Sequence, residues 1–237
     1  MAIVVDPGIW PIRFVRGETL IACWIDLIKL VSIEGRRTGD KKKLPNTILV
    51  VTRPEPLPQK IQSAHVGLVG SEPWERTLRL YTTLDDLSWK RSYRARITGA
   101  KEGGTQLTDV VALLASRPGT SSACCVIARP QDVRRARVIA STVPCPLAID
   151  LKSSDEMLNM TVLFRAQDVF RLGLADLHYL AALQREVLGE VNDLRIKRDR
   201  SPLSCGYLLF HLAVAFIRTI DSTRVAAAEV LVSMDPV

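Results

Sequence analysis

The sequence predicts an α+β fold in which helices flank a mixed β-sheet. Stretches with helical periodicity alternate irregularly with β-branched runs, which is typical of a mixed sheet rather than a doubly wound parallel one. The 237 residues, of which 47% are hydrophobic, suffice for a core that is stable without disulfides or bound metal ions. No internal repeat or low-complexity segment divides the chain. We therefore expect residues 1–237 to form a single domain.

The N-terminal half of the sequence contains three segments with helical spacing and one clear strand. Apolar residues recur every three or four positions over residues 106–116, and Pro118-Gly119 then stops the pattern. Residues 57–70 give no decisive pattern. In chain order we expect a helix at 18–34, a basic loop at 35–45, a strand at 46–52 and helices at 72–81 and 106–116.

The C-terminal half contains three predicted strands, one long helix and one ambiguous segment. The ambiguous segment, residues 208–220, is strongly apolar and fits either a strand or a helix, because periodicity does not decide such a run. In chain order we expect strands at 122–129, 146–151 and 158–165, a helix at 174–191 and a charged loop at 192–202.

The cysteine content and the N-terminus indicate the cytoplasm. The five cysteines are an odd number and include no Cys-x-x-Cys pair, which argues against a disulfide framework and against a structural zinc site. The first residues lack the basic and apolar regions of a signal peptide. No apolar stretch reaches the roughly 18 residues of a membrane span.

The chain carries a formal net charge of +7. A basic chain indicates either nucleic-acid binding or a site for an anionic small molecule. The basic residues are dispersed and are not interleaved with aromatic residues, which make up 5% of the chain. This pattern favours a phosphorylated small-molecule substrate over nucleic acid.

One cysteine and several polar residues follow each other in a distinctive order over residues 144–177. Cys145 stands between two prolines, Arg165 and Asp168 come about one strand and turn later, and Asp176 follows. This order resembles the active-site segment of the thymidylate synthase family, which reads Pro-Cys-His, then Arg-Ser-x-Asp, then Asn. Further similar segments lie, in chain order, at Gly17-Glu18, at Tyr93-x2-Arg96-Ile97 and from Leu180 to Gln184.

This resemblance implies a thymidylate synthase-like fold, with a sheet of roughly six strands and flanking helices. It also implies a homodimer that packs through the sheet face and builds its sites at the subunit boundary. The implied substrate is a pyrimidine nucleotide monophosphate, and the implied one-carbon donor is 5,10-methylenetetrahydrofolate. We expect no membrane partner and no metal.

The residues of this segment suit one-carbon transfer to a pyrimidine ring. C5 of a pyrimidine becomes nucleophilic when a thiolate adds to C6, and Cys145 would be that thiolate. Arg165 would bind the phosphate and lower the thiol pKa. Asp168 would contact the base, and Gln167 beside it would bind substrate. The alternatives are a buried apolar cysteine, a surface ion pair for Arg165 and a helix cap for Asp168.

Asp176 is the residue that bears on the choice of base. It stands where thymidylate synthases have an asparagine that hydrogen-bonds the O4 and N3–H edge of uracil. A carboxylate only accepts hydrogen bonds, which suits the exocyclic amine of cytosine. This exchange resembles the cytidylate hydroxymethylase branch of the family, in which water completes the reaction. The alternative is an exposed cap of the helix that begins there.

Several positions depart from the family pattern. Ser121-Ser122 replaces the arginine pair that the family donates across the dimer, and Arg134 and Arg135 would either take over or lie in a solvated loop. Pro146 and Ala166 replace a histidine and a serine. The remaining candidates are Arg37 for the phosphate, His211 for the sugar, although Ala213 replaces its tyrosine companion, and Glu75 as a general base.

These residues leave three functions open. The first is hydroxymethylation of a cytosine nucleotide, CMP or dCMP, at C5, and this is the function that the sequence favours. The second is a thymidylate synthase that acts on dUMP. The third is a relative that binds a nucleotide without catalysis.

Overall fold

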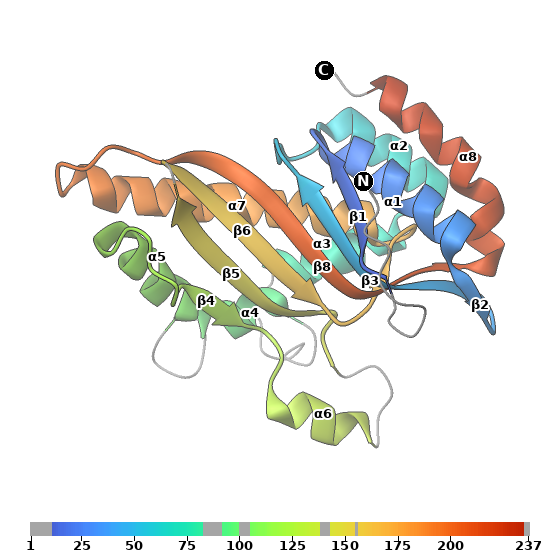
Figure 1. Ribbon diagram of the computed structural model, residues 1–237, viewed down its shortest axis with the longest axis horizontal. Helices are drawn as coiled ribbons and strands as arrows, with labels where there is room; N and C mark the ends of the chain where they lie inside the picture. The colour runs from blue at the N-terminus through green and yellow to red at the C-terminus, as the bar shows by residue number, and fades with distance from the viewer. Residues whose placement is uncertain (1–10, 83–91, 100–104, 138–142, 155, 235–237) are drawn as a thin grey trace.

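The computed structural model describes residues 11–82, 92–99, 105–137, 143–154 and 156–234. It confirms an α+β architecture with a mixed sheet (Figure 1). The helices are α1 (Leu20–Glu34), α2 (Gln59–Val69), α3 (Glu72–Thr82), α4 (Tyr93–Thr98), α5 (Gln106–Ser116), α6 (Pro130–Ala136), α7 (Gly173–Ile196) and α8 (Val225–Ala228). Short 3-10 helices η2 (Thr219–Arg224) and η3 (Glu229–Met234) flank α8. No helix in the described ranges has the length and apolar character to cross a membrane.

Eight strands form one sheet within the described residues, where roughly six were expected. Six of them follow the order β1-β3-β8-β6-β5-β4, and the short strands β2 and β7 pair with β3 and β8. Parallel and antiparallel pairs alternate irregularly across the sheet. The strands are β1 (Arg13–Gly17), β2 (Arg36–Thr38), β3 (Lys41–Val51), β4 (Cys124–Val126), β5 (Pro146–Ser154), β6 (Met157–Phe164), β7 (Gln167–Asp168) and β8 (Ser204–Arg218).

Helices α1 and α7 cover one face of the sheet. Thr19 caps α1 by accepting a hydrogen bond from the Ala22 amide at 3.2 Å, which satisfies one of the free donors at a helix start. Trp24 is fully buried, and its indole Nε1 donates to the Val169 carbonyl at 2.7 Å. That bond ties α1 to the turn between β7 and α7, next to the residues singled out in the sequence.

Two histidines that have no role in the sequence analysis belong to the core beside α7. His65 is fully buried between Trp24 and Trp74, and its Nδ1 accepts from the Trp74 indole at 2.7 Å. Burial lowers the pKa of His65 to about 4, so the ring is neutral at pH 7. His178 accepts from the Leu57 amide at 2.9 Å. Both rings therefore stabilise packing.

The sequence expectations were wrong in three places. The expected basic loop at 35–45 is a hairpin of β2 and the start of β3, because Gly39 at φ 61° supplies its turn. The expected charged loop at 192–202 begins later, because α7 continues to Ile196. The expected buried strand at 122–129 is the short edge strand β4, with Cys124 and Val126 exposed. The ambiguous segment is the strand β8.

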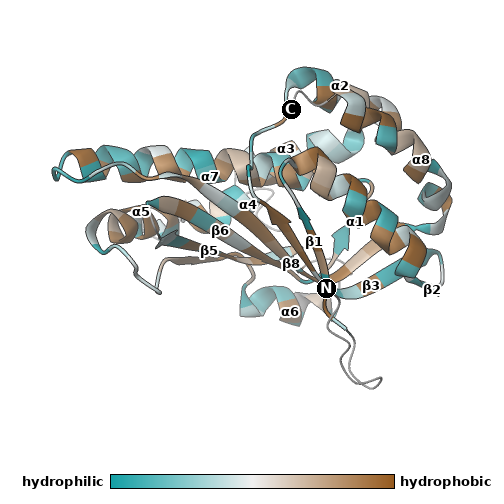
Figure 2. Ribbon diagram, turned by 45° about the horizontal axis from the view of Figure 1, so that its top comes forward, coloured by the Kyte–Doolittle hydropathy of each residue, from teal (hydrophilic) through white to brown (hydrophobic). Residues whose placement is uncertain are grey.

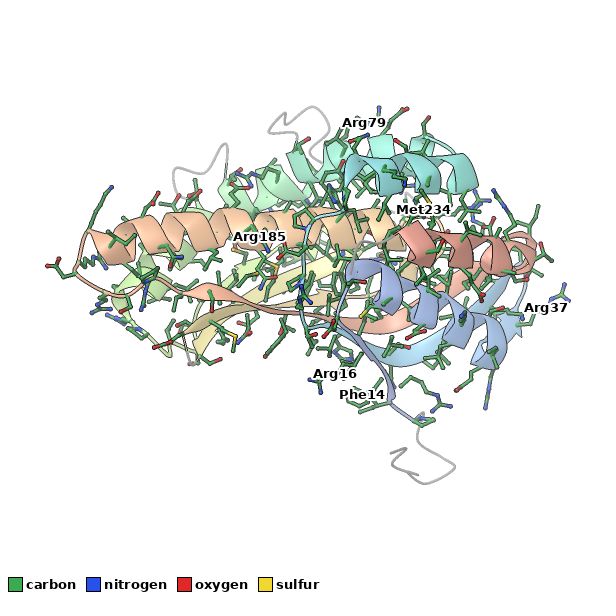
Figure 3. All side chains as sticks on the ribbon, turned by 90° about the horizontal axis from the view of Figure 1, so that it is seen from above. Phe14, Arg16, Arg37, Arg79, Arg185 and Met234 are labelled. Atoms are coloured by element: carbon green, nitrogen blue, oxygen red, sulfur yellow. The ribbon has the colours of Figure 1, made fainter. Side chains whose placement is uncertain are left out.

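Among the described residues no helix layer covers the other face of the sheet (Figures 2 and 3). Figure 3 shows Phe14 and Arg16 on this open face, on the side away from the helices. Strand register places one row of residues across all six main strands on this face, and two of its members, Phe14 and Val126, are 69% and 51% exposed. The row consists of Phe14, Ile48, His211, Leu163, Ala148 and Val126.

The alternation of buried and exposed residues changes phase in the middle of β3 and β8. Leu44 and Thr47 are both buried on β3, and Leu212 and Ala215 are both buried on β8. Asn46, which lies between the buried pair of β3, has φ 51°, a conformation that asparagine adopts more readily than most residues. The phase change separates the apolar row from the end of the sheet where the pocket lies.

Candidate active site

A pocket of about 550 Å³ lies at the end of the sheet where β3, β8 and the start of β5 meet helices α3, α4 and α7. Its size is within the usual range for small-molecule sites. The lining combines cations and apolar side chains around one cysteine. The lining residues are Lys41, Lys43, Arg76, Leu80, Tyr93, Val143, Pro144, Cys145, Arg165, Ala166, Asp168, Leu172, Val214, Phe216 and Arg218.

Cys145 lies at the pocket wall immediately before β5, and its side chain is partly buried. The pKa of its thiol is raised, first by burial and second by the Asp176 carboxylate, while Arg165 and Arg76 act in the opposite direction. Arg165 thus acts on the thiol pKa in the expected direction, but the net pKa is raised because the cost of burying a thiolate exceeds the effect of the nearby cations.

Arg165 holds the chain segment that precedes the cysteine. Its guanidinium donates from Nη2 to the Val143 carbonyl at 2.8 Å and from Nε to the Pro144 carbonyl at 3.1 Å. Its own amide donates to the Cys145 carbonyl at 2.9 Å. The side chain also lines the pocket and is not paired with a carboxylate among the described residues. Arg165 thus fixes the nucleophile candidate and keeps its positive charge.

Asp168 lies in the pocket and is 7% exposed. One oxygen accepts from the Arg171 amide at 3.3 Å, and the other lies 3.6 Å from Arg218 Nε. Burial raises the pKa of Asp168, and the neighbouring Asp221 acts in the same direction. The Asp168 carboxylate therefore caps the start of the next turn and also faces the cavity.

Asp176 and Gln167 form a buried pair behind the cysteine. Gln167 Nε2 donates to Asp176 Oδ2 at 2.5 Å, and the two residues are 3% and 6% exposed, respectively. The alternative of an exposed cap is wrong, because Leu172 holds the N-cap position of α7 and Asp176 points inward from the first turn. Burial raises the pKa of Asp176 to about 6, while hydrogen bonds from Gln167 and Tyr81 and the charge of Arg76 oppose the rise.

The Tyr81 hydroxyl lies next to Asp176. The carboxylate adds to the effect of burial and raises the pKa of the phenol. The approach of the hydroxyl to the carboxylate falls outside ordinary hydrogen-bond distance and angle.

Two pocket residues were missed as candidates by the sequence analysis. Tyr93 is 6% exposed, the Cys145 main chain hydrogen-bonds its hydroxyl, and burial raises its pKa. Arg76 lines the pocket and acts on both the thiol and Asp176. Tyr93 stood in the Tyr-x2-Arg-Ile segment of the resemblance, so that segment was the available signal. For Arg76 the sequence offered no signal except its position beside Glu75.

The candidates Glu75, Arg37 and His211 do not line the pocket. Glu75 is exposed, because the helical period turns Trp74 and Thr77 inward and Glu75 outward on α3. Arg37 is exposed at the hairpin and points into solvent in Figure 3. His211 lies in the row of the open face, roughly 10 Å along β8 from Val214 at the pocket.

Arg134, a candidate on α6, also lies outside the pocket. Arg134 is exposed on α6, which stands off from the sheet in Figure 1. The side chain of Arg135 lies outside the described residues. Ser121 and Ser122 are exposed and precede the edge strand β4. This chain therefore brings Cys145, Arg165, Asp168, Gln167 and Asp176 together, and it leaves the other candidates outside.

Comparison of the sequence with known proteins identifies no relative, so the site has to be interpreted from its own residues. No model of a known protein family matches the chain, and no curated protein sequence matches it. No group of three or more potential metal ligands occurs in the part of the chain that the structure describes.

The buried carboxyl of Asp176 predicts how the free energy of unfolding depends on pH. Its folded pKa of about 6 is above the ordinary 3.8, so the neutral form stabilises the fold below pH 3.8 and this stability is lost as the pH rises to about 6. Asp176→Asn should then match the wild type at pH 3.5 and exceed its free energy of unfolding by up to about 3 kcal/mol at pH 7.5. Urea unfolding at several pH values measures the difference. The exposed Asp193→Asn on the same helix is the control, and equal pH profiles for all three proteins would contradict the assignment.

Proposed function

We propose that this chain transfers a one-carbon unit from 5,10-methylenetetrahydrofolate to C5 of a pyrimidine nucleotide, as an enzyme of the thymidylate synthase-like class. The observation that supports this most is the convergence of Cys145, Arg165 and Asp168 on one pocket, with Asp176 directly behind. Other walls of the pocket come from β3, α3 and β8, which are distant in the sequence from these residues.

The pocket residues suit nucleophilic catalysis on the ring. Cys145 Sγ forms a bond with C6, and the electrons of the C5–C6 double bond make C5 nucleophilic. After C5 bonds to the new carbon, the C5 hydrogen would leave as a proton while the folate nitrogen departs. Water would then add its oxygen to the transferred carbon, and expulsion of the Cys145 thiolate would restore the double bond. Arg165 and Arg76 stabilise the thiolate. Tyr93, with its raised pKa, stays protonated and holds a proton next to the sulfur.

The apolar part of the pocket suits the folate. Leu80, Leu172 and Val214 line the cavity beside the cysteine and would pack against a flat ring. When bound, the folate supplies an electrophilic carbon. The protein's part is to hold the nucleotide so that C5 faces this wall and to keep the site dry.

The buried Asp176 supports a cytosine nucleotide, CMP or dCMP, and a hydroxymethyl product. Its ionised carboxylate accepts a hydrogen bond from an exocyclic amine, and Gln167 holds it in place. The pKa of about 6 favours a second candidate at lower pH, a thymidylate synthase-like reaction on dUMP. A protonated carboxyl both donates and accepts, and so pairs with uracil. The raised pKa of the Cys145 thiol favours a third candidate, a nucleotide-binding relative without catalysis.

We also propose that the open sheet face packs against a second copy of the chain. The row from Phe14 to Val126 is apolar except for His211, and among the described residues no helix lies over it. A partner would remove its apolar side chains from water. In the described residues all five cysteines are free thiols, which supports a reducing compartment, the cytoplasm.

Exchange of the C5 hydrogen tests the proposed chemistry. With CMP or dCMP tritiated at C5, the wild type should release tritium to water, because thiolate addition alone makes C5 exchangeable. Cys145→Ser should lower this rate on the order of a thousandfold or more. The exposed Cys124→Ser controls for general loss of a thiol. Exchange that persists in Cys145→Ser excludes this nucleophile, and absence of exchange from all pyrimidine nucleotides supports the non-catalytic candidate.

Replacement of the buried acid should change the base preference. Asp176→Asn supplies a donor and an acceptor to the base, so affinity should shift from CMP toward UMP by about 10- to 100-fold at pH 7.5, as for other hydrogen-bond mismatches. Titration calorimetry of the four nucleotides CMP, dCMP, UMP and dUMP measures the ratio, and Asp193→Asn is again the control. A wild type that prefers uracil nucleotides at this pH would overturn the cytosine assignment.

The oligomeric state tests the use of the open face. Leu209 lies two residues before His211 on β8, and it forms a second row on the open face with Val50 and Thr161. Leu209→Lys would place a charge in the proposed interface, so it should convert a dimer to a monomer in sedimentation velocity. Ile33→Lys is the matched control, because Ile33 is 82% exposed on α1, away from the sheet face. A monomeric wild type, or a dimer that Leu209→Lys does not weaken, would contradict the proposal.

A further inference from the structure

The pocket contains more positive charge than a neutral base requires. Its described lining includes five cations and one carboxylate, Asp168. Arg76 and Arg165 act on the thiol. The other three, Lys41, Lys43 and Arg218, come from β3 and β8. A water-filled cavity with this excess of cations attracts an anion with more than one negative charge.

Strand geometry places these three cations together. Lys41 pairs with Arg218, and Lys43 pairs with Phe216, in the antiparallel register of β3 and β8. Lys42 points the other way, because its ammonium donates to the Ser32 carbonyl of α1 at 2.6 Å. Side chains two residues apart on a strand share a face, so Lys41 and Lys43 project to the pocket side about 7 Å apart.

The cations at this end of the sheet have little compensation within the chain. Lys41 lies 4.6 Å from the centroid of the Phe216 ring. Arg218 approaches Asp168 only to 3.6 Å. Within the described ranges no ion pair joins Lys41 or Lys43 to a carboxylate. Like charges directly opposite each other on paired strands destabilise a sheet, so this arrangement indicates a missing anion.

The residues expected to bind phosphate are otherwise engaged or absent. Arg165 directs two of its nitrogens to the Val143 and Pro144 carbonyls. The serines at 121 and 122 bring no charge, and Arg37 points into solvent. Arg165 keeps its charge but has few donors left for a phosphate, so further cations have to come from another part of the pocket.

We propose that Lys41, Lys43 and Arg218 bind the phosphate of the nucleotide within one chain, as a phosphate subsite supplied by the strands and not by the partner subunit. This inference rests on the proposed function, and it makes the substrate a nucleotide rather than a nucleoside or a free base. Lys41 and Lys43 act as point charges along β3, and Arg218 adds planar donors from β8.

The test compares CMP with cytidine, which lacks the phosphate, by titration calorimetry of the full chain. The wild type should bind CMP more tightly than cytidine. Lys43→Met and Lys41→Met should each lower CMP affinity about tenfold and leave cytidine affinity unchanged. Lys42→Met removes the same charge from the same strand on the opposite face, and it should leave both affinities unchanged. Circular dichroism confirms that each variant is folded.

Each remaining outcome decides between alternatives. If both lysine variants keep the CMP preference and Arg134→Met loses it, the phosphate is bound by the partner's α6 and the proposal fails. Equal losses in Lys42→Met and Lys43→Met show a general charge effect, which also overturns it. If neither CMP nor cytidine binds, the proposed function fails, and inorganic pyrophosphate becomes the probe. If Lys43→Met then weakens pyrophosphate binding and Lys42→Met does not, the anion subsite is supported on its own. If both variants bind pyrophosphate equally well, the anion subsite is overturned.

Discussion

The hydrogen bonds of Arg165 to the main chain around Cys145 are the constraint on which the site depends. The guanidinium and the amide of this one residue hold three consecutive carbonyls, those of Val143, Pro144 and Cys145. The segment leads into β5, so the sheet and the arginine fix the thiol from two sides. A positioned reactive group needs such support from rigid elements. Because carbonyls and not carboxylates satisfy the guanidinium, its charge still acts on the cavity.

Burial sets the ionisation of the groups in the site. The thiol of Cys145 and the carboxyl of Asp176 each lose the solvation that favours their charged forms, and the carboxylate also disfavours the thiolate. Arg76 opposes both effects. A base that bonds its amine to Asp176 would stabilise the carboxylate, and a bound anion would be stabilised by the lysines. The proposed nucleotide, with a hydrogen-bond donor at one end and a phosphate at the other, would have both effects.

The sequence predicted those features that depend on local pattern. The bounds of α5 agree with the expectation, and α1, α3 and α7 agree within a few residues, because their apolar spacing and caps are local. The hairpin of β2 and β3 was missed because three lysines disfavour a strand, and pairing with β8 outweighs that preference. Sequence patterns also cannot show which side of a helix or strand meets a cavity.

Site prediction failed for the same physical reason. Glu75 and Arg76 are adjacent, yet one faces solvent and the other the pocket. His211 stands on β8, which lines the pocket through Val214, Phe216 and Arg218, but His211 itself lies farther along the strand. Cys145, Arg165 and Asp168, which the sequence singled out and which the pocket brings together, lie next to β5, β6 and β7. The cations of β3 entered the pocket only through a tertiary pairing that no local motif encodes.

The register of Lys41 opposite Arg218 has a consequence for the life of the protein in a cell. Two cations face each other at the end of the sheet, so the empty protein carries an internal repulsion that a bound anion removes. Any ligand that binds only the folded state shifts the folding equilibrium by mass action. Under the proposed function, the amount of folded protein would then follow the supply of the nucleotide, because its binding would oppose opening of this hairpin.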